Sequence, residues 1–268
     1  MVLIKDVTDC STFSVRGLDN QLIAQMNKIC PGLLVSIAHL DVELGQAVHP
    51  WMQAVAATSL EKALASRNET MIINSAYRTL AGQCLLRAHY ELGRCGIVAA
   101  AQPGYSNHNN ASAIDIEDPW SWKSALESNG WRKLGSWDDM HYDHLGCDEI
   151  LDVSVLAFQQ LWNQCRPNDQ LTEDGGMGPA TLSRLRFAPA EGFPGVGIPR
   201  ILRLTQPLQI GEDVGVLQLA LRKAGIEIEK ADKVFGTMTH DAVIKFQEKS
   251  RLLADGIVGA STAKALGI

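Results

Sequence analysis

The feature that most constrains the fold of this chain is an internal repeat in its last third. The segment DGGMGPATLSRL at residues 174–185 is matched without a gap by DGIVGASTAKAL at residues 255–266. A third, shorter match lies at residues 235–246. Self-similarity of this kind is the signature of a repeated structural unit. The paired positions are Asp174 and Asp255, Gly175 and Gly256, Gly178 and Gly259, Thr181 and Thr262, and Leu185 and Leu266.

Each copy predicts a glycine turn that opens a helix, with a threonine near the helix start, where its hydroxyl can cap free N–H groups. Residues 206–268 are therefore predicted to form an all-α module of three helices. Residues 151–187 are predicted to be a truncated copy of the same unit. Residues 188–205 are rich in Pro and Gly and predict a linker. The first helix of the module is indicated by apolar residues at helical spacing, namely Val214, Leu217, Leu221 and Ala224.

The predicted module resembles the peptidoglycan-binding domain that accompanies many cell-wall hydrolases. The resemblance is carried by GEDVGVLQLALRKAG (211–225), FGTMTHDAVIKFQ (235–247) and ADGIVGASTAKAL (254–266), and is weaker in the 151–187 copy. It implies that peptidoglycan is the partner, and that the protein acts at the cell wall, in the periplasm or outside the cell.

Composition excludes several other classes of protein. The chain is 46% hydrophobic and has a net charge of −6, which permits a folded core and argues against nucleic acid as a partner. The longest apolar run, GLLVSIA, is too short to span a membrane, and the first residues show no classical signal peptide. The cysteines, which show no CxxC spacing, are expected to be free. We expect a monomer.

Residues 1–150 predict a separate domain of mixed α and β structure. A strand rich in β-branched residues is expected at 70–78, followed by a helix at 80–93. Further helices are expected at 18–29, 49–67 and 121–131.

This domain contains the residues of a candidate metal site. A catalytic zinc needs about three ligands from His, Asp or Glu and an open position for water. His108, Asp115 and His141 can supply those ligands, and Asp138, three residues before His141, can take a proton from the water. His144 is the competing third ligand. The chain lacks HExxH, so its ligands are expected on strands and loops rather than on one helix.

A second residue competes for the role of base. Asp139 stands two residues before His141 rather than three. A site closed by His144 as a fourth ligand would make the zinc structural rather than catalytic.

These motifs resemble the VanY/VanX type of zinc D-alanyl-D-alanine carboxypeptidases and dipeptidases, together with the related endolysin peptidases of phages. The family pattern is S-x-H-x-x-G-x-A-x-D followed by an acid three residues before a second His. The resemblance implies an α+β domain with a small antiparallel sheet. Ala111 stands where the family has Gly. If the turn needs a positive φ at this position, an alanine strains it, because only glycine adopts such a φ without cost. The matching residues of the pattern are Ser106, His108, Ala113, Asp115, Asp138 and His141.

The upstream segment SAYRTLAGQ (75–83) supplies the expected substrate contacts. Arg78 can bind a peptide carboxylate through two parallel hydrogen bonds. Tyr77, Gln83 and Ser106 are further substrate-binding candidates. The sequence therefore predicts a zinc peptidase that cleaves the peptidoglycan stem peptide. D-Ala-D-Ala carboxypeptidase activity is the first choice and L-alanyl-D-glutamate endopeptidase activity the second. A wall-binding protein with a decayed peptidase domain is the non-enzymatic alternative.

Overall fold

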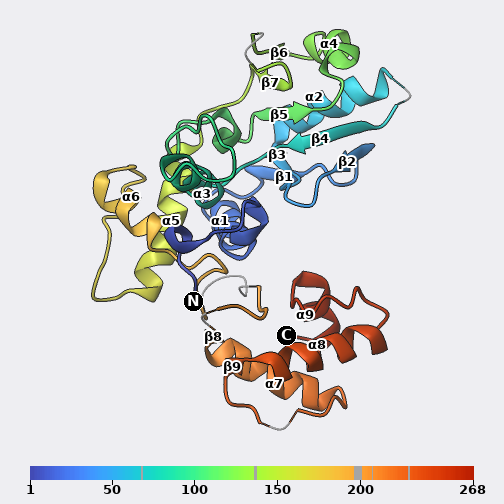
Figure 1. Ribbon diagram of the computed structural model, residues 1–268. Coiled ribbons are helices and arrows are strands. Elements are labelled where there is room, and N and C mark those ends of the chain that lie inside the picture. Colours follow the sequence, from blue (N-terminus) through green and yellow to red (C-terminus); the bar gives the residue numbers. More distant parts are fainter. Residues whose placement is uncertain (68, 136–137, 196–200, 207, 229) are drawn as a thin grey trace.

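A computed structural model of the chain shows a larger body followed by a smaller helical module (Figure 1). The structure describes residues 1–268 except 68, 136–137, 196–200, 207 and 229, so Trp137 and the middle of the expected linker lie outside it. No helix of the described residues is long and apolar enough to cross a membrane.

The larger body is built on a five-stranded sheet in the order β2-β4-β5-β7-β6. Three of the four strand pairings are antiparallel, and β2 joins the edge of β4 in parallel. This sheet with its helices confirms the α+β prediction. The strands are β2 (Val42–Leu44), β4 (Met71–Ser75), β5 (Ala113–Ile116), β6 (Trp131–Lys133) and β7 (His141–His144).

One face of the sheet is covered by apolar packing, and the other carries polar side chains. Alternation along β5 sends Ile114 and Ile116 into a core shared with α2 (Ala54–Ala65) and α4 (Pro119–Glu127). Ala113 and Asp115 therefore point to the opposite face, because successive side chains of a strand alternate. A separate two-stranded pair lies beside this core and is formed by β1 (Leu34–Ser36) and β3 (Trp51–Gln53).

The second half of the larger body is helical. Helices α1 (Arg16–Ile29), α3 (Leu80–Glu91), α5 (Leu151–Cys165) and α6 (Pro179–Arg186) share one core, in which Leu18, Leu85, Phe158 and Leu185 are fully buried. Three short 3-10 helices complete the body, namely η1 (Ile4–Asp6), η2 (Thr12–Val15) and η3 (Asn107–Asn110).

The expected linker does not begin where its composition suggests. Ala188, Ala190 and Phe193 are fully buried in the helical core of the larger body. Phe193 is also fixed by two hydrogen bonds between its backbone and the side chain of Gln21, at 2.7 and 2.8 Å. At the other side, Leu202 forms a β-bridge with Val258 and belongs to the core of the smaller module. The Pro- and Gly-rich composition of residues 188–205 indicates irregular backbone. It does not show that the apolar side chains at the start of this segment are buried in the core of the larger body.

The smaller module contains the three expected helices. Val214, Leu217 and Leu221 are fully buried on one face of the first of them. A pair of two-residue strands, which the sequence analysis did not foresee, joins the loop before the first helix to the loop before the second. The elements are β8 (Gln209–Ile210), α7 (Glu212–Lys223), β9 (Val234–Phe235), α8 (Thr237–Lys249) and α9 (Ala260–Leu266).

The repeat seen in the sequence is a repeat of one hydrogen-bond network, which occurs three times. In each copy a buried glutamine of one helix donates to an aspartate and to a threonine, and accepts from a backbone N–H of the loop between them. The Gln-to-Asp distance is 2.9 Å in all three copies. The sets are Gln159 with Asp174, Gly175 and Thr181, Gln218 with Asp232, Lys233 and Thr239, and Gln247 with Asp255, Gly256 and Thr262.

The expectation that the cysteines are free is wrong for two of them. Cys10 and Cys95 form a disulfide, with Cα atoms 5.5 Å apart. They are 85 residues apart in the sequence, so no local spacing could have shown the pairing. Cys30, Cys84, Cys147 and Cys165 are free.

Candidate metal site

Two paired strands and one short helix bring the three predicted metal ligands together. Asp115 of β5 and His141 of β7 are direct partners in the strand register. His108 lies in η3, just before β5, and its backbone C=O accepts from the N–H of Arg78 at 3.0 Å. His108 and His141 are 4% and 5% exposed.

The ligand atoms converge on one point. Nε2 of His108 is 3.2 Å from Oδ2 of Asp115, and Nδ1 of His141 is 2.9 Å from Oδ1 of the same carboxylate. One ligand atom from each residue lies within 4.8 Å of the other two. Such a set fits a zinc ion with three protein ligands, since zinc takes His nitrogen and carboxylate oxygen at about 2.0–2.2 Å.

Outer hydrogen bonds fix the orientation of both histidines. Nδ1 of His108 donates to the C=O of Ala76 at 2.8 Å, which leaves the Nε2 lone pair for a metal. Nε2 of His141 lies 2.8 Å from Oδ1 of Asp143, which leaves Nδ1 facing Asp115. Partners of this kind set the tautomer of metal-binding histidines and raise their basicity.

Asp143 is a site residue that the sequence analysis missed. Its carboxylate also accepts from Nδ2 of Asn107 at 2.8 Å. The signal was present in HYDH, because residues 141 and 143 of a strand lie on the same face.

The charges of Asp115, His141 and Asp143 stabilise one another. Burial raises the pKa of Asp115, but hydrogen bonds from His108 and His141 outweigh it and hold that pKa well below its usual range. Burial lowers the pKa of His141, but hydrogen bonds to Asp115 and Asp143 outweigh it and raise that pKa to about 9. The protonated, positively charged form of His141 is therefore favoured between Asp115 and Asp143.

The two competing residues lie elsewhere. His144 lies on the opposite face of β7, with Nε2 2.9 Å from the hydroxyl of Ser59 and its ring against Trp131. Asp139 accepts from Nζ of Lys133 at 3.0 Å and is exposed.

Ala111 adopts the left-handed conformation that its place in the motif suggested. Its φ is 51° and its ψ is 32°, at the end of η3. It is 1% exposed, and its C=O accepts from the backbone N–H of Gln53 at 3.0 Å. The neighbouring contacts hold an alanine where glycine would be less strained.

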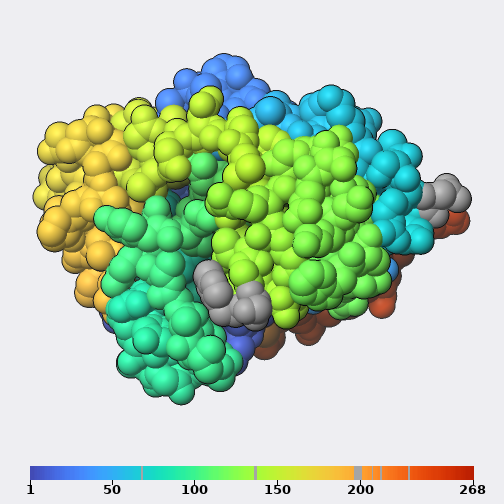
Figure 2. All heavy atoms as spheres, turned by 90° about the horizontal axis from the view of Figure 1, so that it is seen from above, coloured from blue at the N-terminus to red at the C-terminus, as the bar shows by residue number. Residues whose placement is uncertain are grey.

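The three ligands open onto a cavity of about 690 Å³. Asp138, Arg78, Gln83 and Ser106 line the same cavity. In Figure 2 the surface is hollowed between the green atoms around residue 100 and the lime-coloured atoms of the later strands. The structure thus gathers Asp138 with the ligands and leaves Asp139 outside.

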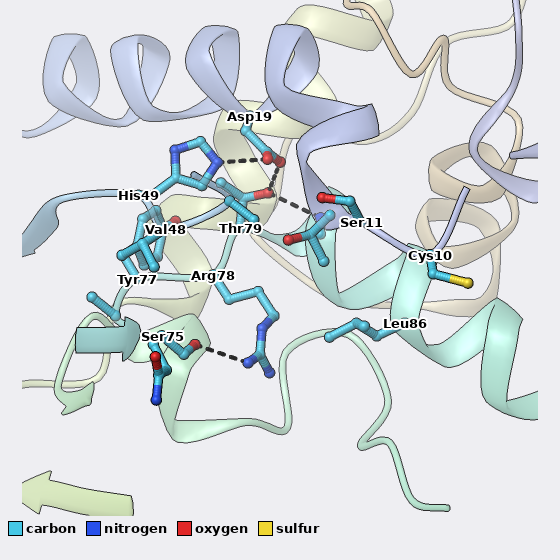
Figure 3. Close-up of a pocket in the computed structure, with 15 residues that line it drawn as sticks. Cys10, Ser11, Asp19, Val48, His49, Ser75, Tyr77, Arg78, Thr79 and Leu86 are labelled. Atoms are coloured by element: carbon cyan, nitrogen blue, oxygen red, sulfur yellow. Dashed lines mark hydrogen bonds and ion pairs between the residues drawn. The ribbon is translucent and has the colours of Figure 1, made fainter. Parts of the chain in front are cut away.

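Arg78 is held between two polar neighbours. Its Nη2 donates to Oγ of Ser75 at 3.0 Å (Figure 3). Its Nη1 donates to Oε1 of Gln83 at 3.2 Å. Gln83 in turn donates to the C=O of Ala101 at 2.9 Å. Burial lowers the pKa of Arg78, and the charge of Asp115 opposes that shift.

Tyr77 does not reach the cavity that holds the ligands. Its hydroxyl donates to Sδ of Met26 at 3.0 Å, and the side chain is buried in the core between α1 and α5. The structure therefore corrects the prediction of a substrate contact for Tyr77.

A smaller cavity of about 290 Å³ lies on the other side of Arg78 and contains a buried polar network (Figure 3). Asp19 accepts from Nε2 of His49 at 2.6 Å and from the hydroxyl of Thr79. Thr79 also caps α3 by accepting from the N–H groups of Ala81 and Gly82. This network anchors the segment that carries Arg78.

Comparison with known proteins supports the assignment of the smaller module. The chain is 33% identical over 119 residues to the N-acetylmuramoyl-L-alanine amidase CwlM of Mycobacterium tuberculosis. The alignment covers 44% of this chain and 27% of that protein, so the chain spans about a quarter of its relative's length. Residues 210–266 match the family model described as "Putative peptidoglycan binding domain". The module of α7, α8 and α9 is therefore a domain of the putative peptidoglycan-binding family.

Proposed function

We propose that this protein is a zinc-dependent hydrolase of the stem peptide of peptidoglycan. The observation that carries the proposal is the meeting of His108, Asp115 and His141 in one cavity with an acid, Asp138, and a cation, Arg78. The peptidoglycan-binding module and the amidase relative support the cell wall as the place of action.

The residues divide the work of hydrolysis among them. Zinc bound to the three ligands would polarise the scissile carbonyl and lower the pKa of a water molecule. The Asp138 carboxylate takes a proton from the attacking water and returns it to the nitrogen of the leaving amine. Arg78 binds a substrate carboxylate close to the scissile bond, and Ser106 is placed to hydrogen-bond the peptide backbone.

The wall-binding module contributes by raising the local concentration of substrate. A module that holds the protein on an insoluble polymer turns the search for a stem peptide into a local one. It does not alter the chemistry at the ligands.

Two bonds of the stem fit this arrangement. In D-Ala-D-Ala carboxypeptidase action, the first choice from the sequence, Arg78 would bind the carboxylate of the terminal residue that leaves. In L-alanyl-D-glutamate endopeptidase action, Arg78 binds the free carboxylate of the glutamate. The second candidate is favoured by the extension of the cavity beyond Arg78, to Arg87 and Tyr90.

Mass spectrometry of muropeptides incubated with the zinc-loaded protein tests the proposal. We expect hydrolysis that stops with a chelator and is absent in His108→Ala. Loss of one terminal alanine identifies a carboxypeptidase, and internal cleavage of the stem an endopeptidase. Release of the intact stem from muramic acid would instead assign the activity named for the relative. A zinc-loaded protein that leaves every muropeptide unchanged would refute the enzyme and leave wall binding alone.

A further inference from the structure

The cavity that holds the metal ligands does not end at Arg78. Its wall continues along one face of α3, where Gln83, Leu86, Arg87 and Tyr90 follow one another at helical spacing. A series of hydrogen bonds links the residues that line the cavity, from the metal ligands to Arg87. Ser75 joins His108 to Arg78, Gln83 joins Arg78 to the loop at Ala101, and Arg87 holds the same loop at Ala100.

Arg87 has donors to spare at this far end. Its Nε donates to Oε1 of Glu91 at 2.8 Å and its Nη1 donates to the C=O of Ala100 at 2.9 Å. Its Nη2 has no hydrogen-bond partner among the described residues. The side chain is 26% exposed, and its guanidinium lies 5.0 Å from the ring centre of Tyr90.

The charge around Arg87 is positive. Glu91 is shared between Arg87 and Arg186, whose Nη2 is 3.2 Å from Oε2 of the same carboxylate. Two cations therefore face one acid. Within the described lining of the cavity, the acids are Asp115 and Asp138, and both belong to the metal end.

The spacing of the two arginines sets the length of the ligand. Arg87 lies seven positions after the start of α3 at Leu80, about 10 Å along the helix axis at 1.5 Å per residue, and Arg78 lies two residues before that start. An extended peptide covers about 3.3 Å per residue, so the span from Arg78 to Arg87 matches about four residues. A carboxypeptidase releases one residue and would leave Arg87 unused.

We propose that Arg87 binds a second carboxylate of the substrate, on a leaving peptide about four residues long whose first carboxylate is bound by Arg78. This deepens the proposed function, on which it rests, by naming the substrate class: an acidic peptide cleaved internally. Between the two arginines, the cavity is lined by Ala100 and Ala101, whose loop is fixed by hydrogen bonds from Arg87 and Gln83.

A pair of peptides tests this inference. N-acetyl-L-Ala-γ-D-Glu-L-Lys-D-Ala-D-Ala is prepared with a C-terminal carboxylate and with a C-terminal carboxamide, and kcat/KM and the cleaved bond are measured for each. We expect cleavage between L-Ala and D-Glu, with the acid preferred about tenfold. Arg87→Met should abolish the preference by slowing cleavage of the acid peptide more than cleavage of the amide peptide. Arg87→Lys keeps the charge but not the bond to Ala100, and should retain a preference.

Arg186→Met is the matched control, because it removes the other cation from Glu91 without lining the cavity. If Arg186→Met and Arg87→Met lose the preference equally, the preference comes from the overall positive charge near Glu91 and not from a carboxylate bound by Arg87. That result would refute the inference. Cleavage only at D-Ala-D-Ala would refute it while the peptidase function stands. If no variant cleaves either peptide, the proposed function fails. Titration of both peptides into zinc-loaded wild type and Arg87→Met then decides the inference by itself, since equal affinities would overturn it.

Discussion

Asp143 lies two residues after His141 on the same strand, and its Oδ1 is 2.8 Å from Nε2 of that histidine. The carboxylate that orients the ligand is thus fixed by the same backbone as the ligand itself. Asn107, next to His108, donates through its Nδ2 to the same Oδ1 at 2.8 Å. The neighbour of one histidine and the ring of the other therefore meet at one carboxylate oxygen of the candidate metal site.

Replacement of this carboxylate should weaken metal binding without removing a ligand. For Asp143→Asn we expect zinc affinity to fall about 10- to 100-fold, the range found when the outer partners of metal ligands are altered. Competition with a coloured chelator measures the affinity. Asp148→Asn, on the loop after β7, is the control and should bind zinc as the wild type does. Equal affinities for Asp143→Asn and the wild type would show that Asp143 does not orient His141.

The two acids before His141 should behave differently. Asp138 lines the cavity, whereas Asp139 is bound by Lys133 outside it. We expect Asp138→Asn to lower kcat about 10²- to 10⁴-fold with zinc content unchanged, as for loss of a general base. Asp139→Asn should keep its activity. Steady-state kinetics on a muropeptide, beside metal analysis, decides the assignment, and the reverse result would transfer the role to Asp139.

Zinc binding should depend on pH through His141. In the metal-free protein the raised pKa of about 9 keeps His141 protonated at neutral pH, so the metal must displace that proton. Apparent affinity should therefore rise about tenfold per pH unit up to about pH 9 and then level off. Calorimetry in buffers of different ionisation enthalpy counts the released proton. A flat profile between pH 7 and 9 would be incompatible with a protonated His141.

The same pKa has a consequence for the stability of the metal-free protein. Because the folded value lies above the ordinary 6.5, the stabilisation by this charged pair is complete below about pH 6.5. It is lost as the pH rises through about 9.

Substitutions of Ala111 test whether the turn at the end of η3 is strained by a side chain at positive φ. For Ala111→Gly we expect unfolding free energy within about 1 kcal/mol of the wild type, because relief at positive φ is offset by the entropy of the unfolded chain. Ala111→Val should cost more than this, since a β-branched residue fits poorly at positive φ and the position is buried. Denaturant unfolding gives both values. A valine variant as stable as the wild type would show that the turn is unstrained.

The glutamine network should stabilise the peptidoglycan-binding module. Gln247→Ala removes the shared partner of Asp255, Gly256 and Thr262, and we expect a loss of about 1–3 kcal/mol. Glu248→Ala, at the next and exposed position, is the matched control. Thermal unfolding followed by circular dichroism compares them. Similar losses in both would mean that the network contributes no more than a surface position does.

The sequence was informative where the pattern is local. The repeat predicted the three helices, because glycine and threonine spacing reflects turns and caps within a few residues. The proposed ligands could be named from short motifs for the same reason. The strand HYDH held the position of Asp143 as well, but only its pairing with β5 shows which face carries the ligands.

Long-range packing was beyond such patterns. The disulfide between Cys10 and Cys95 and the burial of Phe193 beside Gln21 join segments far apart in the chain. Tyr77 was named as a substrate contact from the S-x-Y-R motif of the family that the segment resembles, and that local pattern could not show its packing against Met26, 51 residues earlier in the chain.

The threefold glutamine network belongs to two cores, one copy in the larger body and two in the module. The same local hydrogen-bond network therefore occurs in both units of the chain. Tryptophan is absent from residues 206–268, so fluorescence reports only the larger body, while circular dichroism reports both. Different melting temperatures from the two methods would show that the peptidoglycan-binding module and the larger body unfold in separate steps.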